Sequence, residues 1–436
     1  MKAPLIQRSQ TSLHVAERAT KAAEEEQGEA PHKEVSYLEE AWNIAKALQQ
    51  EAVSGGDGSV TWLTVEALPR SGRYQYQPAA ATLFAGIAGI GLFLAASARA
   101  FNDSSLRATA LAAARTIEKR FGTSGPSLIS EIGLGAATGL GSVVYSLTGM
   151  AEFLGEEELL SLAQKGAERV TEHTIDSDQR YDLVSGAAGT ILALIRLYRT
   201  APREWLLSRA NDCGSMLLKR SQVTGDGRRS WSTMPGTPLI GMSHGATGIA
   251  YALLRLYEFS GTKSFGQAAM QSIAYERALF DEKAGDWPDL RFRDESRPDV
   301  FTTTWCHGAP GIGLARIATL DLLNDPSIRL EIEHAVRATA QFGVRGVDHV
   351  CCGNFGRIEF LSTAGIRVAR PEWCEMAHKF ASRVLDARSE GGGYRLFQNL
   401  PRGISAPGFF QGMAGIGYSL LRLANSKSNP CVLTWD

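Results

Sequence analysis

Two kinds of hydrophobic pattern alternate along residues 36–436 of the chain. In the first kind, apolar residues recur at spacings of three and four with charged residues between them, as in LEIEHAVRATAQF. This pattern is typical of an amphipathic helix with one buried face. It occurs in seven segments, at residues 37–52, 104–121, 156–174, 204–221, 263–282, 326–344 and 371–389.

The second kind of pattern is a pair of glycines followed by a segment that is hydrophobic almost all round, which predicts a helix buried on every side. Seven such segments begin at Gly86, Ala136, Gly186, Gly245, Gly308, Gly353 and Gly412, at intervals of 45 to 63 residues. The second segment differs from the others, because it has Ala136 where they have glycine. Glycine at these helix starts permits a positive φ and a close approach of neighbouring backbone.

The alternation predicts an all-α fold of repeated helix pairs. Burying the hydrophobic helices behind the amphipathic ones gives two concentric rings, an (α/α)7 toroid or barrel. Stretches rich in Gly, Asp and aromatic residues predict short hairpins or loops between outer and inner helices, in SGGDGSVTWLTV, TGDGRRSWST, AGDWPDLRF and GGGYRLF. The glycine turns are then expected to converge at one end of the ring, where residues far apart in the sequence become neighbours.

Length and composition narrow the class of protein. The 436 residues suit one large domain or two to three ordinary ones, and we expect a flexible polar arm or linker at residues 1–35 before a toroid domain at residues 36–436. A formal net charge of −1 argues against broad electrostatic binding to nucleic acid or membranes. The sequence has neither a signal-peptide pattern nor an apolar run of transmembrane length, so we expect a cytoplasmic protein whose six cysteines are mostly reduced.

Three cysteines lie next to two of the glycine turns. Cys306 and Cys351 each precede a turn glycine by two residues, and Cys352 precedes one directly. Superposed turns would bring three soft thiolates together, which predicts a Zn²⁺ site with an open fourth position, whereas a fourth ligand from His307 or His349 would make a closed structural site. A single cysteine is usually a packing residue, but three at matching repeat positions favour a metal. The other cysteines are expected to be packing residues: Cys213, Cys374 and Cys431.

Two polar residues beside the neighbouring turns are candidates for proton transfer. His244 directly precedes Gly245, at a place equivalent to the cysteines, which favours a general acid or base over a purely structural histidine. Asp182 lies on the turn before it and could orient or charge that imidazole, or could cap the buried helix that follows. The glycine pairs lack the lysine of a phosphate loop and the βαβ context of a dinucleotide site, so we interpret them as structural.

These motifs resemble those of the lanthionine synthetase C-like family, the lanthipeptide cyclases. The matching elements are YDLVSGAAG, SHGATG, WCHGAPG and CCGNFG together with the glycine repeat, so the resemblance extends over residues 36–436. The chain looks most similar to the C-terminal cyclase domain of class II bifunctional synthetases. The resemblance implies zinc ligands at Cys306, Cys351 and Cys352, and active-site roles for His244 and Asp182.

The chain departs from the family pattern at several positions. Cys352 replaces the histidine that most members carry, and this third thiolate is expected to make a bound substrate sulfur more nucleophilic. His307 and Thr302 stand where many members have tyrosine and arginine. An arginine role therefore cannot be transferred to Thr302.

The resemblance implies a zinc-dependent enzyme that adds the cysteine thiols of a peptide to dehydroalanine or dehydrobutyrine, giving lanthionine or methyllanthionine thioether rings. Its implied partners are a dehydrated ribosomal precursor peptide and a dehydratase, either a separate protein or a joined domain. Two alternatives stay open: a non-catalytic module that binds zinc and a thiol or peptide, and a toroidal glycosidase. A glycosidase would need paired carboxylates at the ring mouth, where only Asp182 and Asp348 lie near the turns.

Overall fold

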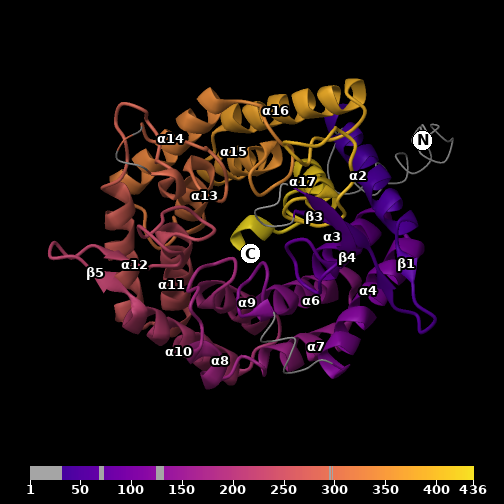
Figure 1. Cartoon of the computed structure of the whole chain (residues 1–436), viewed down its shortest axis with the longest axis horizontal. Helices are drawn as coiled ribbons and strands as arrows, with labels where there is room; N and C mark the ends of the chain where they lie inside the picture. Colours follow the sequence, from indigo (N-terminus) through magenta and orange to yellow (C-terminus); the bar gives the residue numbers. More distant parts are fainter. Residues whose placement is uncertain (1–31, 68–72, 124–131, 294–295, 297) are drawn as a thin grey trace.

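The computed structural model describes residues 32–67, 73–123, 132–293, 296 and 298–436. Within this part of the chain, seven outer and seven inner helices alternate and form two concentric rings, the (α/α)7 toroid that the hydrophobic pattern predicts (Figure 1). The outer helices are α2 (His32–Gln50), α4 (Ser104–Thr123), α7 (Glu157–Ala167), α10 (Glu204–Arg220), α12 (Lys263–Arg277), α14 (Pro326–Phe342) and α16 (Pro371–Glu390), with a short helix α8 (Glu172–Asp176) after α7. The inner helices are α3 (Ile87–Phe101), α6 (Leu140–Leu154), α9 (Ala187–Thr200), α11 (Ala246–Ser260), α13 (Ala309–Ala318), α15 (Asn354–Val368) and α17 (Met413–Ala424).

The two rings differ in burial as their sequences predict. In the inner helix α6, every residue except Glu152 is buried, because the helix packs against ring neighbours on both sides and an outer helix behind it. In the outer helix α10, the buried residues include Leu206, Ala210 and Cys213, whose spacing of four and three leaves the opposite face to solvent. The ring closes where α17 packs against α2 and α3, so the first and last repeats are neighbours (Figure 1).

Two outer helices end five or more residues before the predicted end, whereas the other five end within two residues of it. The single helix expected at residues 156–174 is divided into α7 and α8, because Thr171 has an extended backbone and forms a capping box with the third residue of the new helix. The helix expected at residues 263–282 ends at Arg277. The chain then turns on the carboxylate of Asp281, which accepts two backbone N–H groups and so competes with a further helical turn.

The glycine pairs are required by close packing and not by an unusual backbone conformation. None of the first glycines of the described turns lies in the left-handed region, so the expectation of a positive φ there is wrong. Each has an extended backbone, with φ 164° at Gly308 and, for example, φ −118° at Gly245, which begins α11. A Cβ added there would lie 2.2 Å from the carbonyl carbon of Ile240. At the second glycine, Gly248, a Cβ would lie 2.1 Å from the carbonyl oxygen of Met242. No side chain fits at such distances, so the expected close approach of backbone is confirmed.

The second repeat keeps its first glycine, three residues later than the sequence pattern places it. Helix α6 begins after Gly139, which has the same extended conformation, and a Cβ there would lie 2.2 Å from the carbonyl carbon of Leu134. Ser142 then occupies the place of the second glycine. The expectation that Ala136 replaces a turn glycine is therefore wrong. In the sequence, Gly139 looks like the second glycine of a pair that starts at Ala136. In the structure it is the first position of the turn, and Ser142 stands at the second position.

A closed circle of backbone hydrogen bonds joins the glycine turns. In each turn, the residue two places before the first glycine donates its N–H to the carbonyl oxygen of the corresponding residue in the next turn, over distances of 2.8 to 3.3 Å. Within the described residues, the order is Phe84, Ala137, Val184, Ser243, Cys306, Cys351, Phe410 and back to Phe84. The turns therefore converge at one end of the toroid, as predicted, and residues at matching positions become neighbours.

The C-terminal tail lies at the centre of the inner ring (Figure 1). It ends in the 3₁₀ helix η2 (Val432–Thr434) followed by Trp435, which stacks on Phe410 with ring centroids 5.9 Å apart and lies 6.0 Å from the ring of Trp305. Phe410 belongs to the hydrogen-bonded circle and Trp305 directly precedes Cys306. The aromatic side chain of the tail thus packs against the turns from inside the ring. This contact removes apolar surface of both the tail and the turns from solvent.

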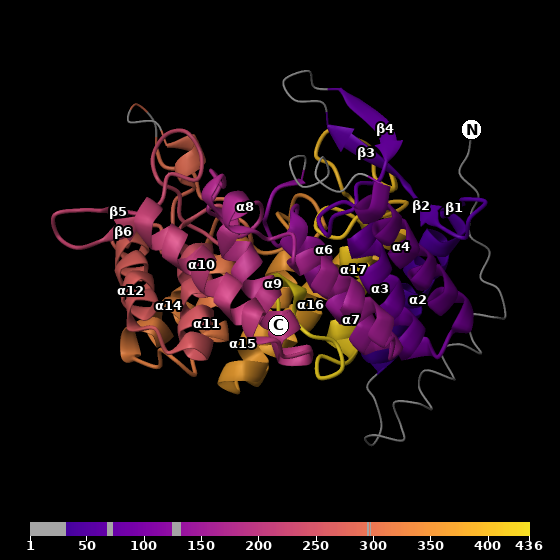
Figure 2. The same ribbon diagram turned by 90° about the horizontal axis from the view of Figure 1, so that it is seen from below.

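Short antiparallel hairpins connect outer helices to inner helices on the side of the glycine turns. They are formed by β1 (Val53–Ser54) with β2 (Val60–Thr61), β3 (Leu63–Ala67) with β4 (Tyr74–Pro78), and β5 (Gln222–Val223) with β6 (Arg229–Ser230). In Figure 2 they lie along the upper side of the molecule, above the helices. The stretch AGDWPDLRF forms a loop with the 3₁₀ helix η1 (Leu290–Phe292), and GGGYRLF forms a loop without strands, so the predicted mixture of hairpins and loops is confirmed.

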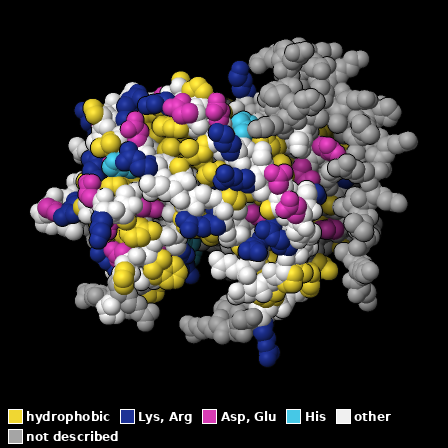
Figure 3. Space-filling model, turned by 90° about the horizontal axis from the view of Figure 1, so that it is seen from above, with side chains coloured by type: hydrophobic (Ala, Val, Ile, Leu, Met, Phe, Trp, Pro, Cys, Tyr) yellow, Lys and Arg dark blue, Asp and Glu magenta, His cyan; other side chains and the backbone are white. Residues whose placement is uncertain are grey.

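The surface charge is mixed. On the face in Figure 3, Lys and Arg side chains are interspersed with Asp and Glu, and no described region of one sign dominates. This distribution agrees with the formal net charge of −1. Among the described residues, no helix combines the length and the apolar character needed to cross a membrane.

Candidate metal centre

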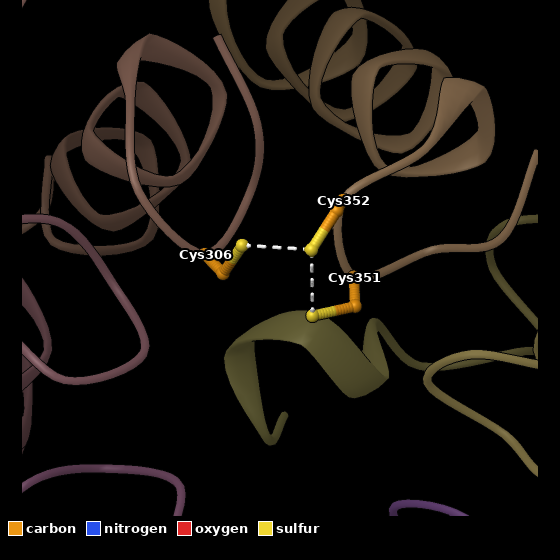
Figure 4. Close-up of side chains that lie close together, drawn as sticks. All are labelled: Cys306, Cys351 and Cys352. Atoms are coloured by element: carbon orange, nitrogen blue, oxygen red, sulfur yellow. Dashed lines mark hydrogen bonds between the residues drawn. The ribbon is translucent and has the colours of Figure 1, made fainter. Parts of the chain in front are cut away.

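Three cysteine sulfurs meet at the circle of turns. Cys306 and Cys351 are consecutive members of that circle, and the N–H of Cys306 donates to the carbonyl oxygen of Cys351 at 3.3 Å. Cys352 follows in the same loop, and its sulfur lies between the other two (Figure 4). The Sγ of Cys352 is 3.2 Å from the Sγ of Cys306 and 3.5 Å from that of Cys351. Cys306 and Cys351 thus occupy equivalent positions on neighbouring turns, as the repeat predicts.

The donor set fits a soft divalent cation. All three sulfurs lie within 4.8 Å of one another. Two thiolates bound to tetrahedral Zn²⁺ at ~2.3 Å would lie ~3.8 Å apart, so small side-chain rotations suffice. Thiolates favour Zn²⁺ over hard cations such as Mg²⁺ and Ca²⁺. Among the described residues, neither a carboxylate nor an imidazole joins this group, so a cation held here would keep its fourth position open.

His307 and His349 lie beside the cysteines without completing the ligand set. His307 Nε2 is 3.2 Å from the hydroxyl of Ser243, and His349 Nδ1 accepts the backbone N–H of Cys352 at 3.4 Å. Burial lowers the pKa of each imidazole to about 4, so both rings are neutral at neutral pH. The geometry therefore does not support the alternative of a closed four-ligand site.

The cysteines are electrostatically unequal. Hydrogen bonds from Cys351 and Cys352 lower the pKa of Cys306 well below its ordinary value, and the same contact raises the pKa of Cys351. The hydroxyl of Thr304, 3.3 Å from the Sγ of Cys306, also favours the thiolate. The centre thus combines one readily formed thiolate with two thiols, and a bound cation would deprotonate those two through its own charge.

His244 and Asp182 form a hydrogen-bonded pair on the two turns that precede Cys306. His244 Nδ1 lies 2.8 Å from Oδ2 of Asp182. The Asp182 side chain is 1% exposed and that of His244 is 28% exposed, so a buried carboxylate holds Nδ1 and leaves Nε2 for another partner. The ring of His244 is 5.7 Å from the ring of His307, the residue next to Cys306. The pair therefore lies beside the cysteine cluster.

Asp182 does not cap the helix that follows it, which was the alternative expectation for this residue. The N-cap of α9 is Gly186, which has no side-chain hydrogen bond, and the N–H of Ala187 is accepted by the carboxylate of Asp178 at 2.8 Å. Oδ1 of Asp182 instead accepts the N–H of Ser185 at 2.7 Å, within the turn itself. One carboxylate oxygen thus fixes the turn and the other holds His244.

Two further residues at the centre were not expected from the sequence. Ser243 belongs to the hydrogen-bonded circle, and its hydroxyl donates to the carbonyl oxygen of Cys306 at 3.0 Å. Thr304 contacts the Cys306 sulfur from the position that Asp182 occupies two turns earlier, four residues before the turn glycine. Both were detectable, because each is a polar residue at a repeat position where another turn has a candidate site residue.

A family model described as lanthionine synthetase C-like protein matches residues 77–434, which is most of the chain. The chain belongs to the lanthionine synthetase C-like family. Among solved structures, the lanthionine synthetase C-like chain is similar to nisin cyclase, with 18% identity and a TM-score of 0.57 over 81% of this chain and 92% of that one. At this identity the likeness shows a shared fold. A search of curated protein sequences found no match.

Two further solved structures have lower scores. A sugar epimerase from a ruminal bacterium is 11% identical with a TM-score of 0.48, over 90% of this chain and 99% of that one. The GH76A α-1,6-mannanase from Salegentibacter sp. is also 11% identical, with a TM-score of 0.46 over the same shares.

The two carboxylates considered for a glycosidase have other partners in this lanthionine synthetase C-like toroid. Asp348 accepts the side-chain amide of Asn354 at 2.8 Å and the backbone N–H of Arg395 at 2.7 Å. Asp182 is held by His244 and its own turn. Neither carboxylate faces a second carboxylate across a cleft, as the two catalytic carboxyl groups of a glycosidase do. The geometry therefore does not support a glycosidase.

Proposed function

We propose that this lanthionine synthetase C-like protein is a zinc-dependent lanthipeptide cyclase. The observation that carries the proposal is the joint position of three cysteine sulfurs and the His244–Asp182 pair on consecutive turns at one end of the toroid. Cys306, Cys351 and Cys352 would hold Zn²⁺ and leave one position for a substrate sulfur. A thiol-binding centre beside a partly exposed imidazole suits the addition of a thiol to an unsaturated peptide.

The zinc would supply one chemical effect, the lowering of the pKa of a substrate thiol so that it is held as a thiolate. The remaining chemistry concerns a proton at His244. When the substrate sulfur bonds to the β-carbon of dehydroalanine or dehydrobutyrine, the electron pair of the double bond moves to the α-carbon and its carbonyl group. Protonated His244, stabilised at Nδ1 by Asp182, would donate its Nε2 proton to that α-carbon.

The reaction balances within the substrate and the protein. The substrate thiol loses one proton and the α-carbon gains one, so ring formation is an isomerisation that consumes no oxidant, reductant or other reactant. Neutral His244 would then recover its proton from solvent before the next ring forms. The partly exposed position of its side chain allows that exchange, whereas the buried His307 and His349 are poorly placed for it.

We infer the substrate class from the same chemistry. A peptide with both free cysteines and dehydrated serine or threonine residues is required, which implies a dehydrated ribosomal precursor peptide. A dehydratase must therefore act first, on a separate chain or as a domain joined to this one. The similarity of WCHGAPGIGLAR and PCVLTWD to class II synthetases favours the C-terminal cyclase domain of such an enzyme as a counterpart.

The test uses the purified chain, Zn²⁺ and a dehydrated peptide that contains cysteines. Free thiols are alkylated at successive times and counted by mass spectrometry, because each ring formed removes one alkylation site without changing the peptide mass. We expect thiols to disappear faster than in a reaction without protein. Persistent thiols with zinc bound would favour the non-catalytic module that binds zinc and a thiol or peptide, and would overturn the enzymatic proposal.

A further inference from the structure

The hydroxyl group of Thr304 lies against the first cysteine sulfur of the candidate metal centre. Its Oγ1 is 3.3 Å from the Sγ of Cys306, and both side chains are buried. The same oxygen accepts the backbone N–H of His307 at 3.3 Å, so its own proton is free to be donated. A cysteine sulfur that binds a cation has no proton, so Thr304 is the donor and the sulfur the acceptor whenever a metal is held.

The backbone directly before Thr304 has a strained conformation. Thr303 has a φ of 45°, in the left-handed region that a β-branched residue rarely adopts. Its hydroxyl donates to Oδ2 of Asp286 at 2.8 Å, and its carbonyl oxygen accepts Nη1 of Arg357 at 3.4 Å. All three residues are buried. Strain of this kind persists only where surrounding contacts impose it, so these contacts fix the direction in which the chain enters Thr304.

The turn that carries Asp182 has the same construction. Tyr181 has a φ of 62° and, like Thr303, lies five residues before its turn glycine. Among the described residues, the other non-glycine positions with a left-handed φ end helices. Asp182 and Thr304 each follow the left-handed residue, and each accepts the N–H of the residue three places later. Because Asp182 also holds His244, the left-handed residue in both turns aims the next side chain at a residue of the site.

We propose that Thr304, aimed by Thr303, is a positioning residue whose hydrogen bond to the metal-bound sulfur of Cys306 strengthens the binding of a substrate thiol at the fourth position of the cation. This inference deepens the proposed function and rests on it, because it requires a cation held by the three cysteines. Thr304 acts through Cys306 and not by contact with the thiol. The thiol gives its proton to the solvent as its sulfur binds, so no other reactant is needed.

The effect follows from the charge that three thiolates donate to one cation. Thiolates donate more charge than a neutral imidazole does, and a cation that has received more charge binds a fourth sulfur less tightly. A hydrogen bond to a thiolate draws electron density toward the donor, so Cys306 then donates less to the cation. Among the described residues, the sulfurs of Cys351 and Cys352 have only cysteine sulfurs as hydrogen-bond partners. Cys306 is therefore the ligand whose donation a hydroxyl group reduces.

The experiment compares Thr304→Val, Thr304→Ser and the matched control Thr319→Val. Thr319 is also buried, but it lies at the opposite end of α13 from the cysteine turn, and its hydroxyl donates to the carbonyl oxygen of Ala315 at 2.9 Å. Each protein is loaded with Co²⁺, and the sulfur-to-cobalt charge-transfer band is recorded as 2-mercaptoethanol is added at one fixed pH.

We expect Thr304→Val to move the charge-transfer band to longer wavelength, because a sulfur without the hydrogen bond gives up charge more readily. Thiol binding should weaken by about threefold to tenfold, the effect of one hydrogen bond on an equilibrium constant. Thr304→Ser should keep both properties, since the N–H of His307 can hold the serine oxygen in place. Thr319→Val should change neither property.

X-ray absorption at the cobalt edge counts the sulfur ligands and separates this effect from a distorted turn, because valine also leaves the N–H of His307 without its acceptor. Thr304→Ala, which removes the hydroxyl without adding bulk, gives a second measurement of the same loss. Loss of a sulfur ligand in both variants would overturn the inference. A thiol affinity within about twofold of wild type would also overturn it, and so would a serine variant as weak as the valine variant.

These outcomes leave the proposed function intact. Wild-type protein that binds no metal would overturn both the proposed function and this inference. Wild-type protein that binds metal and thiol but forms no thioether ring would overturn the enzymatic proposal and leave the role of Thr304 standing.

Discussion

The contact between Asp182 and His244 gives the sharpest test of the proposed chemistry, through the substitution Asp182→Asn. The side chain is 1% exposed and uses both oxygens, one for the N–H of Ser185 at 2.7 Å and one for His244 Nδ1 at 2.8 Å. Asparagine has nearly the same shape and can keep its oxygen on Ser185. Its NH₂ group would then face His244 Nδ1, which must offer a lone pair, so the carboxylate no longer stabilises a protonated imidazole.

The expected loss follows from the strength of this hydrogen bond. A hydrogen bond to a charged partner contributes about 1.5–3 kcal/mol, and each ~1.4 kcal/mol of barrier is a factor of ten in rate. We therefore expect Asp182→Asn to slow ring formation by roughly 10- to 100-fold, with unchanged zinc content. The assay is a single-turnover time course at saturating protein, with free thiols counted by alkylation and mass spectrometry. Thermal stability should change little, because Ser185 keeps its acceptor.

Asp178→Asn is the matched control. Its carboxylate accepts backbone N–H groups of Arg180, Tyr181 and Ala187 in the same loop, but it does not contact His244. We expect this variant to reduce the thermal stability of the protein more than it reduces the rate of ring formation. A rate for Asp182→Asn within about threefold of wild type would refute the role of the pair. Equal slowing in Asp178→Asn would show that loop geometry, and not the carboxylate–imidazole contact, sets the rate.

Four further outcomes are expected. Cys306→Ala should lose zinc on dialysis, measured by elemental analysis, whereas Cys213→Ala should keep zinc and lower only the melting temperature, because Cys213 is a packing residue in α10. Cys352→His should keep zinc but slow cyclisation in the thiol assay, because one thiolate is lost; an equal or faster rate would contradict this. Gly245→Ala should destabilise the fold by more than about 3 kcal/mol in denaturant titrations, while Gly225→Ala, where an added Cβ meets nothing within 4 Å, should be neutral. Chelation of zinc should abolish cyclisation yet leave the helical circular dichroism signal, because backbone bonds hold the turns.

The helices and their order were predictable because two different periodicities mark the two rings. The buried inner segments and the amphipathic outer segments differ in how much of their circumference is apolar, and burial in α6 and α10 follows that difference. The error at Ala136 has a local origin, since Ser142 fills a place where other repeats have glycine. The break at Thr171 was missed because a capping box competes with a continuous apolar pattern.

The candidate site was predictable to the extent that it belongs to the repeat. Cys306 and Cys351 lie at the same distance from their turn glycines, so equivalent turns bring them together. The ion pair between Arg291 and Asp289 in η1 was not predictable, because it lies in an irregular loop whose length and path no periodicity describes. A charged residue in a sequence does not reveal whether it is buried, as the side chain of Asp289 is.

The circle of backbone hydrogen bonds holds the cysteine turns together without a metal. The fold therefore does not depend on a bound cation, although the site could hold one. Cys306 and Cys351 are each bonded through N–H and carbonyl oxygen to both neighbouring turns, so the backbone fixes the separation of their side chains before any metal arrives. Small zinc domains show the opposite order, since their ligands come together only when the metal binds and their folding energy is the metal's binding energy. A preformed site avoids that coupling. The affinity of this centre then depends on its local charge, to which Cys352 contributes, and not on the stability of the toroid.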